Sequence, residues 1–546
     1  MATRKKAPSA TVPDAQYVVR GFIVHLGRDL SPKKRKAALQ RIRAQVPELA
    51  HAVDARALDR ARPLGKGAAD VLIALPRQHA VDIREAWNVV HALRRNALVA
   101  DAEPAVRTAS GVAPPEGKRF AAIGGPEGPP LPQASTPRWS VDNARISDEW
   151  PATRGYGVLV GHPDTGYTHN PQIDNARLLA AYGYNFQEGN ADPLDRMSGS
   201  YPGHGTATAS VIMADAQPVY GAALEARLIP YRVSDSVIHF DFTNLTQALY
   251  RARDQQCDLV SMSLGGPWAG RALSRAVDTL VAADIILLAA AGNVWPWVVY
   301  PAKFDNVVAV AASNAIDKPW KDSASGDEVD ISAPGESVWR AWSQKINGAM
   351  DYSVAPSSGT SYAVATAAGA CALWLSLHGA AALRARYPGR VAAVFMDLLK
   401  SAGFRSIAGW KTGSYGPGIL DAAALLAAPL PAQAPAAIAR VRSAVATSQR
   451  SYAWARLQPF FPELSPEKLA RSIVPAFGKR PATAARQLAD VIDEVEFFVA
   501  TSPEVRRSVI AGAQPPKRGR SAIAAESPRA MLRSVGSAHL RAKLKG

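Results

Sequence analysis

The sequence predicts a three-layer α/β/α domain with a mostly parallel sheet, preceded by a small α+β domain and followed by a helical extension. Between residues 138 and 428, short apolar strands alternate with helical stretches, as in a parallel sheet covered on both faces. The continuous apolar run Ile285–Ala290 suits a fully buried parallel strand. The length of 546 residues fits several domains of ordinary size.

The chain before this domain follows the order strand, helix, two strands, helix, strand. Residues 1–13 are expected to be a disordered basic segment, and residues 14–108 to form the small domain. Its strands are expected at 17–26, 56–64, 68–75 and 97–106, and its helices at 32–46 and 80–93. This βαββαβ order describes a ferredoxin-like domain.

The central domain is expected to contain at least five buried strands and one long buried helix. The strands are expected at Gly157–Val160, Leu228–Val233, Leu259–Met262, Ile285–Ala290 and Val307–Ala311. The Ala-rich run from Ala363 to Leu377 follows a Gly-Thr-Ser turn and favours a helix packed inside the domain.

Two segments rich in Pro separate these parts. Residues 109–137 are dense in Pro and Gly, and residues 429–440 consist mainly of Ala and Pro, so both are expected to be linkers. Residues 441–512 are expected to form several short helices, and residues 513–546 a basic disordered tail.

The net charge of +17 is concentrated at the two ends of the chain. Residues 1–50 carry 11 Lys and Arg against 3 Asp and Glu, and residues 505–546 carry 10 against 1. Both ends are predicted to be solvated, disordered segments. The alternative is that they bind nucleic acid or an anionic surface.

The apolar runs, the N-terminus and the two cysteines indicate the cellular location of the protein. Charged residues, Gly or Pro interrupt the longest apolar stretches, so no transmembrane helix is expected. No secretory signal is evident, which favours a cytoplasmic location and leaves secretion by another route as the alternative. Cys257 and Cys371 lie in apolar segments and are expected to be buried free thiols rather than a disulfide.

Three separated residues could together perform nucleophilic catalysis. Asp164 follows a predicted strand, His204 lies between glycines at a helix start, and Ser361 stands at the start of the Ala-rich helix. A serine hydroxyl is a poor nucleophile unless a base takes its proton; imidazole suits that task, and a carboxylate fixes its tautomer. Singly, each residue could be a turn residue, a helix-start histidine or a helix cap.

The surrounding motifs resemble those of the subtilisin-like serine peptidases, the subtilase or S8 family. Asp164-Thr165-Gly166, His204-Gly205-Thr206 and Gly359-Thr360-Ser361 are similar to that family's three active-site signatures, in its order along the chain. Ser263–Gly266 and Ala289–Asn293 are similar to further family segments. The likeness covers residues 138–428.

The resemblance implies a serine endopeptidase. Ser361 would attack the scissile carbonyl, His204 would transfer the proton, and Asp164 would orient the imidazole. The Asn293 side chain and the Ser361 N–H would hold the oxyanion. Substrate would pair along Ser263, Leu264 and Gly265.

The side chain before the cut would lie against Val299, which with nearby tryptophans favours an apolar or aromatic preference. The alternative is that those tryptophans only pack beneath a loop. His162-Pro163 and Ala207-Thr208 depart from the residues usual in the family.

The small domain resembles the inhibitory propeptide of subtilases. We therefore expect it to act as an intramolecular inhibitor that is cut off within residues 107–137, or to be retained as a regulator. No cofactor is expected, and no calcium at the loop 214–219, because that loop lacks oxygen ligands; a site around 190–195 stays open. Expected partners are a protein or peptide substrate and an unidentified partner for the C-terminal extension.

Two rival functions remain from the sequence. One is a catalytically silent scaffold of the same fold that binds partners through residues 441–546. The other is a serine esterase or amidase that uses the same three residues on small acyl substrates.

Overall fold

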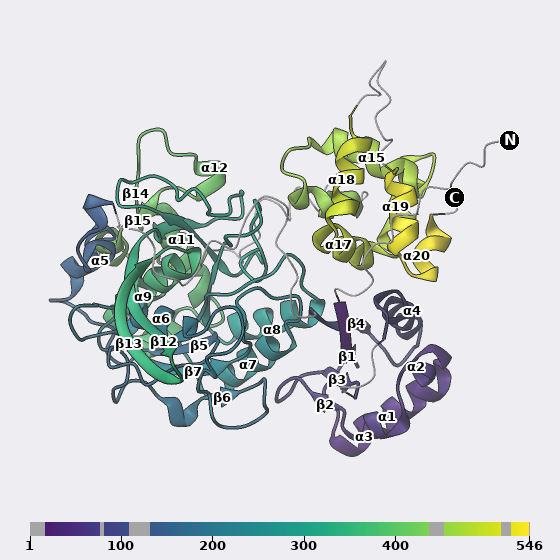
Figure 1. Ribbon diagram of the computed structural model, residues 1–546, viewed down its shortest axis with the longest axis horizontal. Coiled ribbons are helices and arrows are strands. Elements are labelled where there is room, and N and C mark those ends of the chain that lie inside the picture. The colour runs from purple at the N-terminus through teal and green to yellow at the C-terminus, as the bar shows by residue number, and fades with distance from the viewer. Residues whose placement is uncertain (1–16, 77–80, 109–130, 436–452, 515–525, 545–546) are drawn as a thin grey trace. The chain divides into compact units, whose positions relative to one another are not determined.

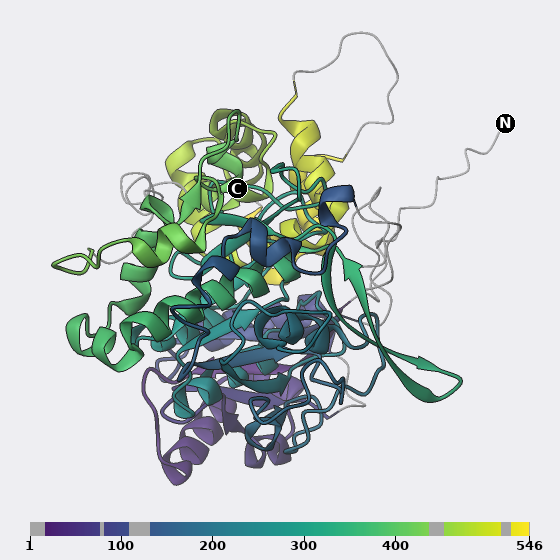
Figure 2. The ribbon, with the colours of Figure 1, turned by 90° about the vertical axis from the view of Figure 1, so that its left-hand side faces the viewer.

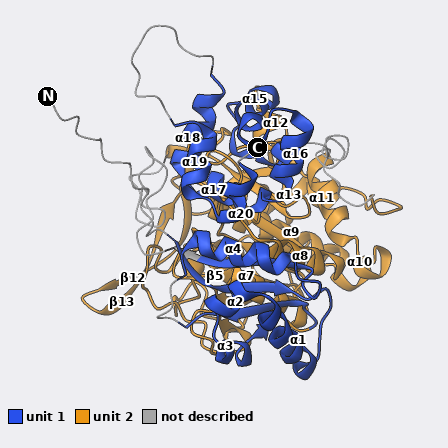
Figure 3. Ribbon diagram, turned by 90° about the vertical axis from the view of Figure 1, so that its right-hand side faces the viewer, with its two compact units in different colours: residues 1–63, 67–113, 451–546 blue, residues 64–66, 114–450 orange. Residues whose placement is uncertain are grey.

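The computed structural model describes residues 17–76, 81–108, 131–435, 453–514 and 526–544. It divides into two compact units, coloured in Figure 3: unit 1 comprises residues 1–63, 67–113 and 451–546, and unit 2 residues 64–66 and 114–450. The expected disordered segment 1–13, most of the linker 109–137 and parts of 429–440 and 513–546 lie outside the described residues.

The N-terminal part of unit 1 has its strands and its two expected helices in the predicted order, with two further short helices, Pro47–Ala52 and Ala55–Asp59, that were not predicted. Its antiparallel sheet has the strand order β2-β3-β1-β4 (Figure 1). The elements are β1 (Tyr17–His25), α1 (Pro32–Gln45), α2 (Pro47–Ala52), α3 (Ala55–Asp59), β2 (Arg62–Pro63), β3 (Asp70–Ala74), α4 (Ile83–Arg94) and β4 (Asp101–Thr108).

One of its expected strands is wrong. Residues 56–64 were expected to be extended, but Ala55–Asp59 form α3, and only Arg62–Pro63 pair in the sheet. The Asp54 carboxylate accepts a hydrogen bond from the Ala57 N–H at 2.7 Å, a helix N-cap that starts α3.

The C-terminal part of unit 1 is helical. Its elements are η4 (Ala453–Phe460), α15 (Pro466–Phe477), α16 (Pro481–Ala489), α17 (Ile492–Thr501), α18 (Pro503–Gly512), α19 (Pro528–Val535) and α20 (Ala538–Lys543). The expectation of a disordered tail over 513–546 is therefore wrong for α19 and α20. Ser527 and Ser537 cap these helices, and Leu532 and Leu540 are fully buried between their basic residues.

Unit 2 is built on a nine-stranded sheet of order β14-β15-β11-β10-β9-β8-β5-β7-β6. Neighbouring strands are parallel except for β14 and β15, which pair antiparallel. Its strands are β5 (Leu159–Asp164), β6 (Tyr184–Asn185), β7 (Arg227–Arg232), β8 (Leu259–Met262), β9 (Ile286–Ala290), β10 (Val308–Ser313), β11 (Ile331–Pro334), β14 (Phe404–Arg405) and β15 (Ile419–Leu420). The five strands expected from the sequence are all present.

Helices cover this sheet in two layers. α6 and α9 contact each other and the sheet, while α7 and α8 pack together against β5 and β9 (Figure 1). The helices are η1 (Pro132–Ala134), α5 (Trp139–Asn143), η2 (Ser147–Glu149), η3 (Ala180–Tyr182), α6 (His204–Met213), α7 (Thr243–Asp254), α8 (Arg271–Ala282), α9 (Thr360–His378), α10 (Ala380–Arg386), α11 (Val391–Ser401), α12 (Thr412–Tyr415) and α13 (Ala422–Ala427). The three-layer expectation is confirmed.

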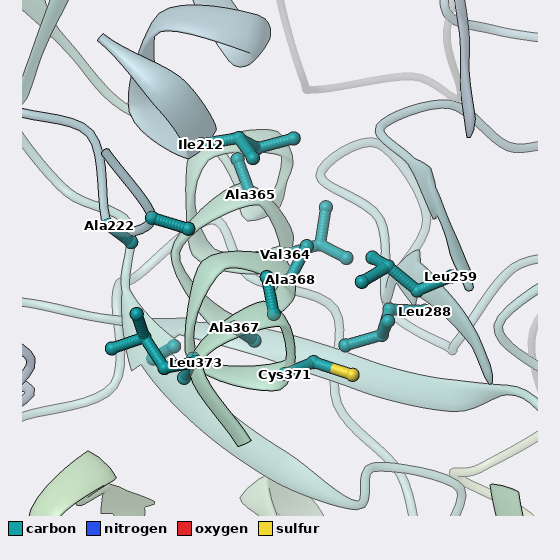
Figure 4. Close-up of a cluster of buried hydrophobic side chains, with 14 of the residues drawn as sticks. Ile212, Ala222, Leu259, Leu288, Val364, Ala365, Ala367, Ala368, Cys371 and Leu373 are labelled. Carbon is teal, nitrogen blue, oxygen red and sulfur yellow. The ribbon is translucent and has the colours of Figure 1, made fainter. Parts of the chain in front are cut away.

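Helix α9 is the centre of the core. Figure 4 shows small side chains such as Ala365 and Ala368 on α9 packed among Ile212, Leu259 and Leu288. By length and composition α9 is long and apolar enough to cross a membrane, but 89% of its most apolar stretch is buried inside the protein. Both cysteines are buried free thiols, as expected.

A β-hairpin that was not predicted from the sequence precedes α9. Strands β12 (Val338–Ile346) and β13 (Ala349–Ser357) pair antiparallel and project from the body of unit 2 (Figure 2). Asn347 and Gly348 form its turn with φ of 51° and 85°. Asn-Gly is the strongest short-range signal for such a turn, so the sequence did contain the information.

Candidate active site

Three elements of unit 2 end or begin at the residues singled out from the sequence. Asp164 is the last residue of β5, His204 the first of α6, and Ser361 the second of α9. Asn293 follows β9. In an open parallel sheet, functional groups gather beyond the carboxyl ends of the strands, which is where Asp164 and Asn293 lie.

Asp164 and His204 form a buried pair. Asp164 Oδ1 lies 2.8 Å from His204 Nδ1 and also accepts the Thr165 N–H at 2.7 Å. The two side chains are 0% and 2% exposed. Burial alone would raise the pKa of Asp164, but the charge of His204 and its hydrogen bond outweigh it, so the pKa lies below its usual value. The pair therefore holds an ionised carboxylate against the imidazole.

The second oxygen of Asp164 contacts residues to which the sequence interpretation gave no role. Thr208 Oγ1 donates to Asp164 Oδ2 at 3.3 Å and lies 3.0 Å from His162 Nε2. Burial lowers the pKa of His162 to about 4, so this imidazole is neutral near neutral pH. His162 and Thr208, noted only as unusual residues, thus fix the face of Asp164 that is turned away from His204.

A second carboxylate, Asp195, holds the start of α6 in place. Asp195 Oδ2 accepts the Thr165 hydroxyl at 2.6 Å and the Gly203 N–H at 2.8 Å, and Thr165 Oγ1 accepts the Gly205 N–H at 3.0 Å. A Cβ at Gly205 would lie 2.0 Å from the Gly166 carbonyl oxygen, so this close approach requires glycine. From the sequence, residues 190–195 were considered only as a cation site, and the role of Asp195 at α6 was not predicted.

The Ser361 hydroxyl is hydrogen-bonded to a backbone carbonyl and not to His204. Ser361 Oγ donates to the Ser263 carbonyl at 3.3 Å, and Ser263 Oγ donates to the Ser361 carbonyl at 3.0 Å. The ring of the next residue, Tyr362, is centred 6.4 Å from the His204 ring. Within the described part of the chain, His204 Nε2 has no hydrogen-bond partner. Rotation about χ1 of Ser361 would turn its hydroxyl toward another acceptor. Hydrogen bonds between a nucleophile and its base often form or shorten only when substrate is bound.

Asn293 is oriented by the turn before Ser361. Its Oδ1 accepts the Thr360 N–H at 3.0 Å and the Thr360 hydroxyl at 2.7 Å. A Cβ built on Gly359 would lie 3.5 Å from Asn293 Nδ2 and 3.6 Å from the Ser361 nitrogen. The Ser361 N–H belongs to the first helical turn, where N–H groups have no acceptor within the helix. Two N–H donors therefore border the same space beside Gly359.

In the expected substrate strand, Ser263, Leu264 and Gly265, both backbone groups of Gly265 are engaged. The Gly265 N–H donates to the Val237 carbonyl at 2.9 Å, and the Gly265 carbonyl accepts the His239 N–H at 2.8 Å. On the other side, Gly266 exchanges both backbone hydrogen bonds with Tyr300. A peptide can pair with Gly265 only if residues 237–239 move aside.

Val299 packs against two glycines of the site. A Cβ on Gly265 would lie 2.6 Å from Val299 Cγ2, and a Cβ on Gly292 would lie 3.1 Å from the same atom. Val299 is 3% exposed. The Val299 side chain therefore occupies the space that the missing side chains leave between Gly265 and Gly292.

Residues 188–196, which include the segment 190–195 considered from the sequence as a cation site, form ion pairs with one another. Glu188 and Asp192 both bind Arg196, at 2.6 and 2.8 Å, and Asp195 supports α6 as described above. In the described ranges, no group of three or more His, Cys, Asp or Glu is arranged to hold a metal ion.

Comparison with solved structures shows a shared fold. The structure of fervidolysin from Fervidobacterium pennivorans, described as a keratinolytic enzyme related to subtilisin, aligns with a TM-score of 0.54 at 17% identity. The alignment covers 78% of this chain and 63% of the fervidolysin chain.

Comparison of sequences identifies the family. A protein named intracellular serine protease from Paenibacillus polymyxa is 34% identical over 240 residues, which cover 42% of this chain and 70% of that protein. Subtilisin DY from Bacillus licheniformis is 31% identical over 236 residues, 41% of this chain and 79% of that protein. The model of the subtilase family, Peptidase S8, matches residues 155–401. The chain belongs to the subtilase family of serine peptidases.

Proposed function

We propose that this peptidase is an endopeptidase that uses Asp164, His204 and Ser361 as its catalytic residues. The observation that carries the proposal is the buried 2.8 Å bond between Asp164 and His204 Nδ1. It leaves His204 Nε2 unbonded among the described residues, on a helix that contacts α9, of which Ser361 is the second residue. Asp164 holds the proton on Nδ1, so Nε2 is the basic nitrogen.

The chemistry follows from these positions. Ser361 Oγ attacks the carbonyl carbon of the scissile bond while His204 Nε2 takes its proton, and His204 then gives this proton to the leaving amine. Water attacks the acyl-enzyme with His204 again as the base, which releases the acid and restores Ser361. Asn293 Nδ2 and the Ser361 N–H stabilise the negative charge on the carbonyl oxygen in both steps.

The reaction class is tested with two substrates, an unfolded protein and a small ester. An endopeptidase hydrolyses both the protein and the ester, and His204→Ala lowers both rates of hydrolysis by a similar factor. A chain that hydrolyses the ester and leaves the protein intact is an esterase, and a chain that cleaves neither after removal of the N-terminal domain is a silent scaffold.

Replacing Gly359 by Ala tests the space between the two N–H donors. The Gly359 φ of 168° is extended backbone that Ala adopts, so we expect a folded protein. The added methyl lies 3.5 Å from Asn293 Nδ2 and displaces the oxyanion. Loss of one oxyanion donor in subtilisin itself lowers kcat by about 10²–10³, and we expect a fall of that order. Gly413→Ala is the control, because nothing lies within 4 Å of its Cβ position; equal kcat for both variants contradicts the proposed oxyanion position.

We also propose that the enzyme prefers a small apolar side chain before the cut. Val299 fills the space beside Gly265 and Gly292, which leaves less room for the aromatic side chains that the sequence also allowed. Val298 and Trp297 next to it are buried, and an unpaired cation is costly in apolar surroundings.

Replacing Val299 by Ala and then by Gly should enlarge the accepted side chain stepwise. One methylene in an apolar pocket changes kcat/KM by about 10–200-fold, so we expect Val299→Gly to raise the ratio for Phe over Ala substrates by at least about tenfold. The measurement compares kcat/KM for peptides that differ only in the residue before the cut. A ratio that stays constant through both substitutions places the determinant elsewhere.

The N-terminal domain, residues 14–108, is proposed to act as an intramolecular inhibitor of this site. Its four-stranded sheet with helices after the first and third strands, and its resemblance to subtilase propeptides, support this role. An intracellular location is proposed as well, supported by the relative named intracellular serine protease.

A further inference from the structure

The outer face of helix α4 in the N-terminal domain is covered by the C-terminal extension. Trp87, His91 and Arg94 recur at the spacing of one helical face, and Trp87 and His91 are 0% and 4% exposed. Figure 1 and Figure 3 both place α17 and α20 beside α4, within unit 1. The two ends of the chain, more than 300 residues apart in sequence, thus share one packed surface.

A buried carboxylate lies at the centre of this surface. Glu494, 0% exposed, accepts from His91 Nε2 at 2.8 Å and from the backbone N–H and hydroxyl of Ser537 at 2.7 and 2.8 Å. Burying a carboxylate is costly unless donors satisfy it. Because one of its three donors comes from the N-terminal domain, Glu494 is best satisfied when that domain is in place.

Further polar contacts surround this carboxylate. Arg94 Nη2 pairs with Asp493 Oδ2 at 2.7 Å, and the Tyr17 hydroxyl donates to the Thr501 carbonyl at 3.0 Å. The Asn88 side chain accepts the Ala538 N–H at 2.9 Å. These contacts come from two elements of the N-terminal domain and two of the extension, so they fix orientation as well as position.

Aromatic rings fill the surface between the polar groups. The Phe497 ring is centred 5.4 Å from that of Tyr17 and 6.1 Å from that of Trp87, and the His539 ring lies 4.4 Å from that of His91. Buried aromatic anchors with satisfied polar partners are typical of the energetic centre of a stable interface. This surface has the features of a binding interface rather than of a loose contact.

From these contacts we infer that the partner of the C-terminal extension is the N-terminal domain, and that the two remain bound when the chain is cut on both sides of the peptidase domain. This inference goes beyond the proposed function. It rests on that function only in assuming that the peptidase activity cleaves the chain. The proposed inhibitor would then be released together with residues 453–544 rather than alone.

The test uses the full-length chain with Ser361→Ala, so that no hydrolysis of its own contributes. Recognition sequences for a foreign endopeptidase are inserted within residues 109–130 and 436–450, and an affinity tag follows residue 546. After cutting, the tagged C-terminal piece is captured and washed, and the retained fraction of the N-terminal piece is measured. The same assay is run on Glu494→Leu, on the milder Tyr17→Phe, and on Glu467→Gln, an exposed control on the extension.

We expect the N-terminal piece to stay on the captured extension, with release at least tenfold faster in Glu494→Leu, measurably faster in Tyr17→Phe and unchanged in Glu467→Gln. An N-terminal piece that washes away from the unaltered extension overturns the inference. Equal retention in all three variants also overturns it, because the contacts described would then not hold the pieces together. Neither result bears on the proposed function, which is tested by hydrolysis with Ser361 present.

Discussion

Replacing Ser361 by Ala should abolish peptide hydrolysis, with kcat lower by about 10⁶-fold, the loss known from subtilisin when its nucleophile is removed. The expected residual rate reflects binding and the oxyanion donors, which the substitution leaves in place. Stability should change little, because Ser361 Oγ makes one long hydrogen bond, 3.3 Å to the Ser263 carbonyl. The measurement is kcat on a peptide substrate together with the intact mass of the purified chain.

The mass gives a second expectation from the same sample. If the N-terminal domain is removed by self-cleavage within residues 107–137, the wild type is shortened and Ser361→Ala stays full length. Ser376→Ala is the matched control, because Ser376 lies near the other end of α9 and its hydroxyl donates to the Tyr156 carbonyl. If Ser361→Ala keeps wild-type hydrolysis, another residue is the nucleophile.

Replacing Asp164 by Asn should lower kcat by about 10⁴-fold with little change in KM. The amide preserves the shape of the side chain but removes the charge that holds the proton on His204 Nδ1, 2.8 Å away, and that stabilises the imidazolium. Thr208 can still bond to the second terminal atom of the side chain, and His162 still contacts Thr208. The position of residue 164 should therefore be kept, and the substitution should lower the rate of the chemical step.

The control for this variant is Asp174→Asn. Asp174 also pairs with a histidine, His169, at 3.1 Å, but this pair is exposed to solvent. Loss of an exposed pair should leave kcat unchanged, because such pairs contribute little. A similar fall of kcat in both variants would show that the effect of Asp164→Asn is general rather than specific to the site.

Much of the central sheet and of the candidate site followed from the sequence, because the local signals there are strong. Strand β8 matches its expected range, Leu259–Met262. Strand β9, Ile286–Ala290, lies within its expected range because a buried parallel strand is a continuous apolar run. Asp164, His204 and Ser361 could be found because each stands where a strand ends or a helix begins, and because their neighbouring motifs resemble one family.

Other features depended on contacts between distant segments, which periodicity does not report. Asp195 and Thr208 have side chains that bond to residues of other elements, so their local sequence does not reveal the roles that they play in the site. Helices α19 and α20 were missed because their basic residues hide the buried Leu532 and Leu540, whose burial requires tertiary partners. The pairing of Glu494 with His91, 403 positions away, could not be read from either segment alone.

The central claim, that Ser361 is a nucleophile activated by His204, is tested most directly by reaction with a fluorophosphonate followed by peptide mapping. The reagent is applied to the full chain and to the chain freed of its N-terminal domain, each in wild-type, His204→Ala and Ser361→Ala forms. We predict one adduct, on Ser361, in the wild type, formed far more slowly in His204→Ala and absent in Ser361→Ala. An adduct on a different serine, or none on either folded wild-type form, would contradict the assignment.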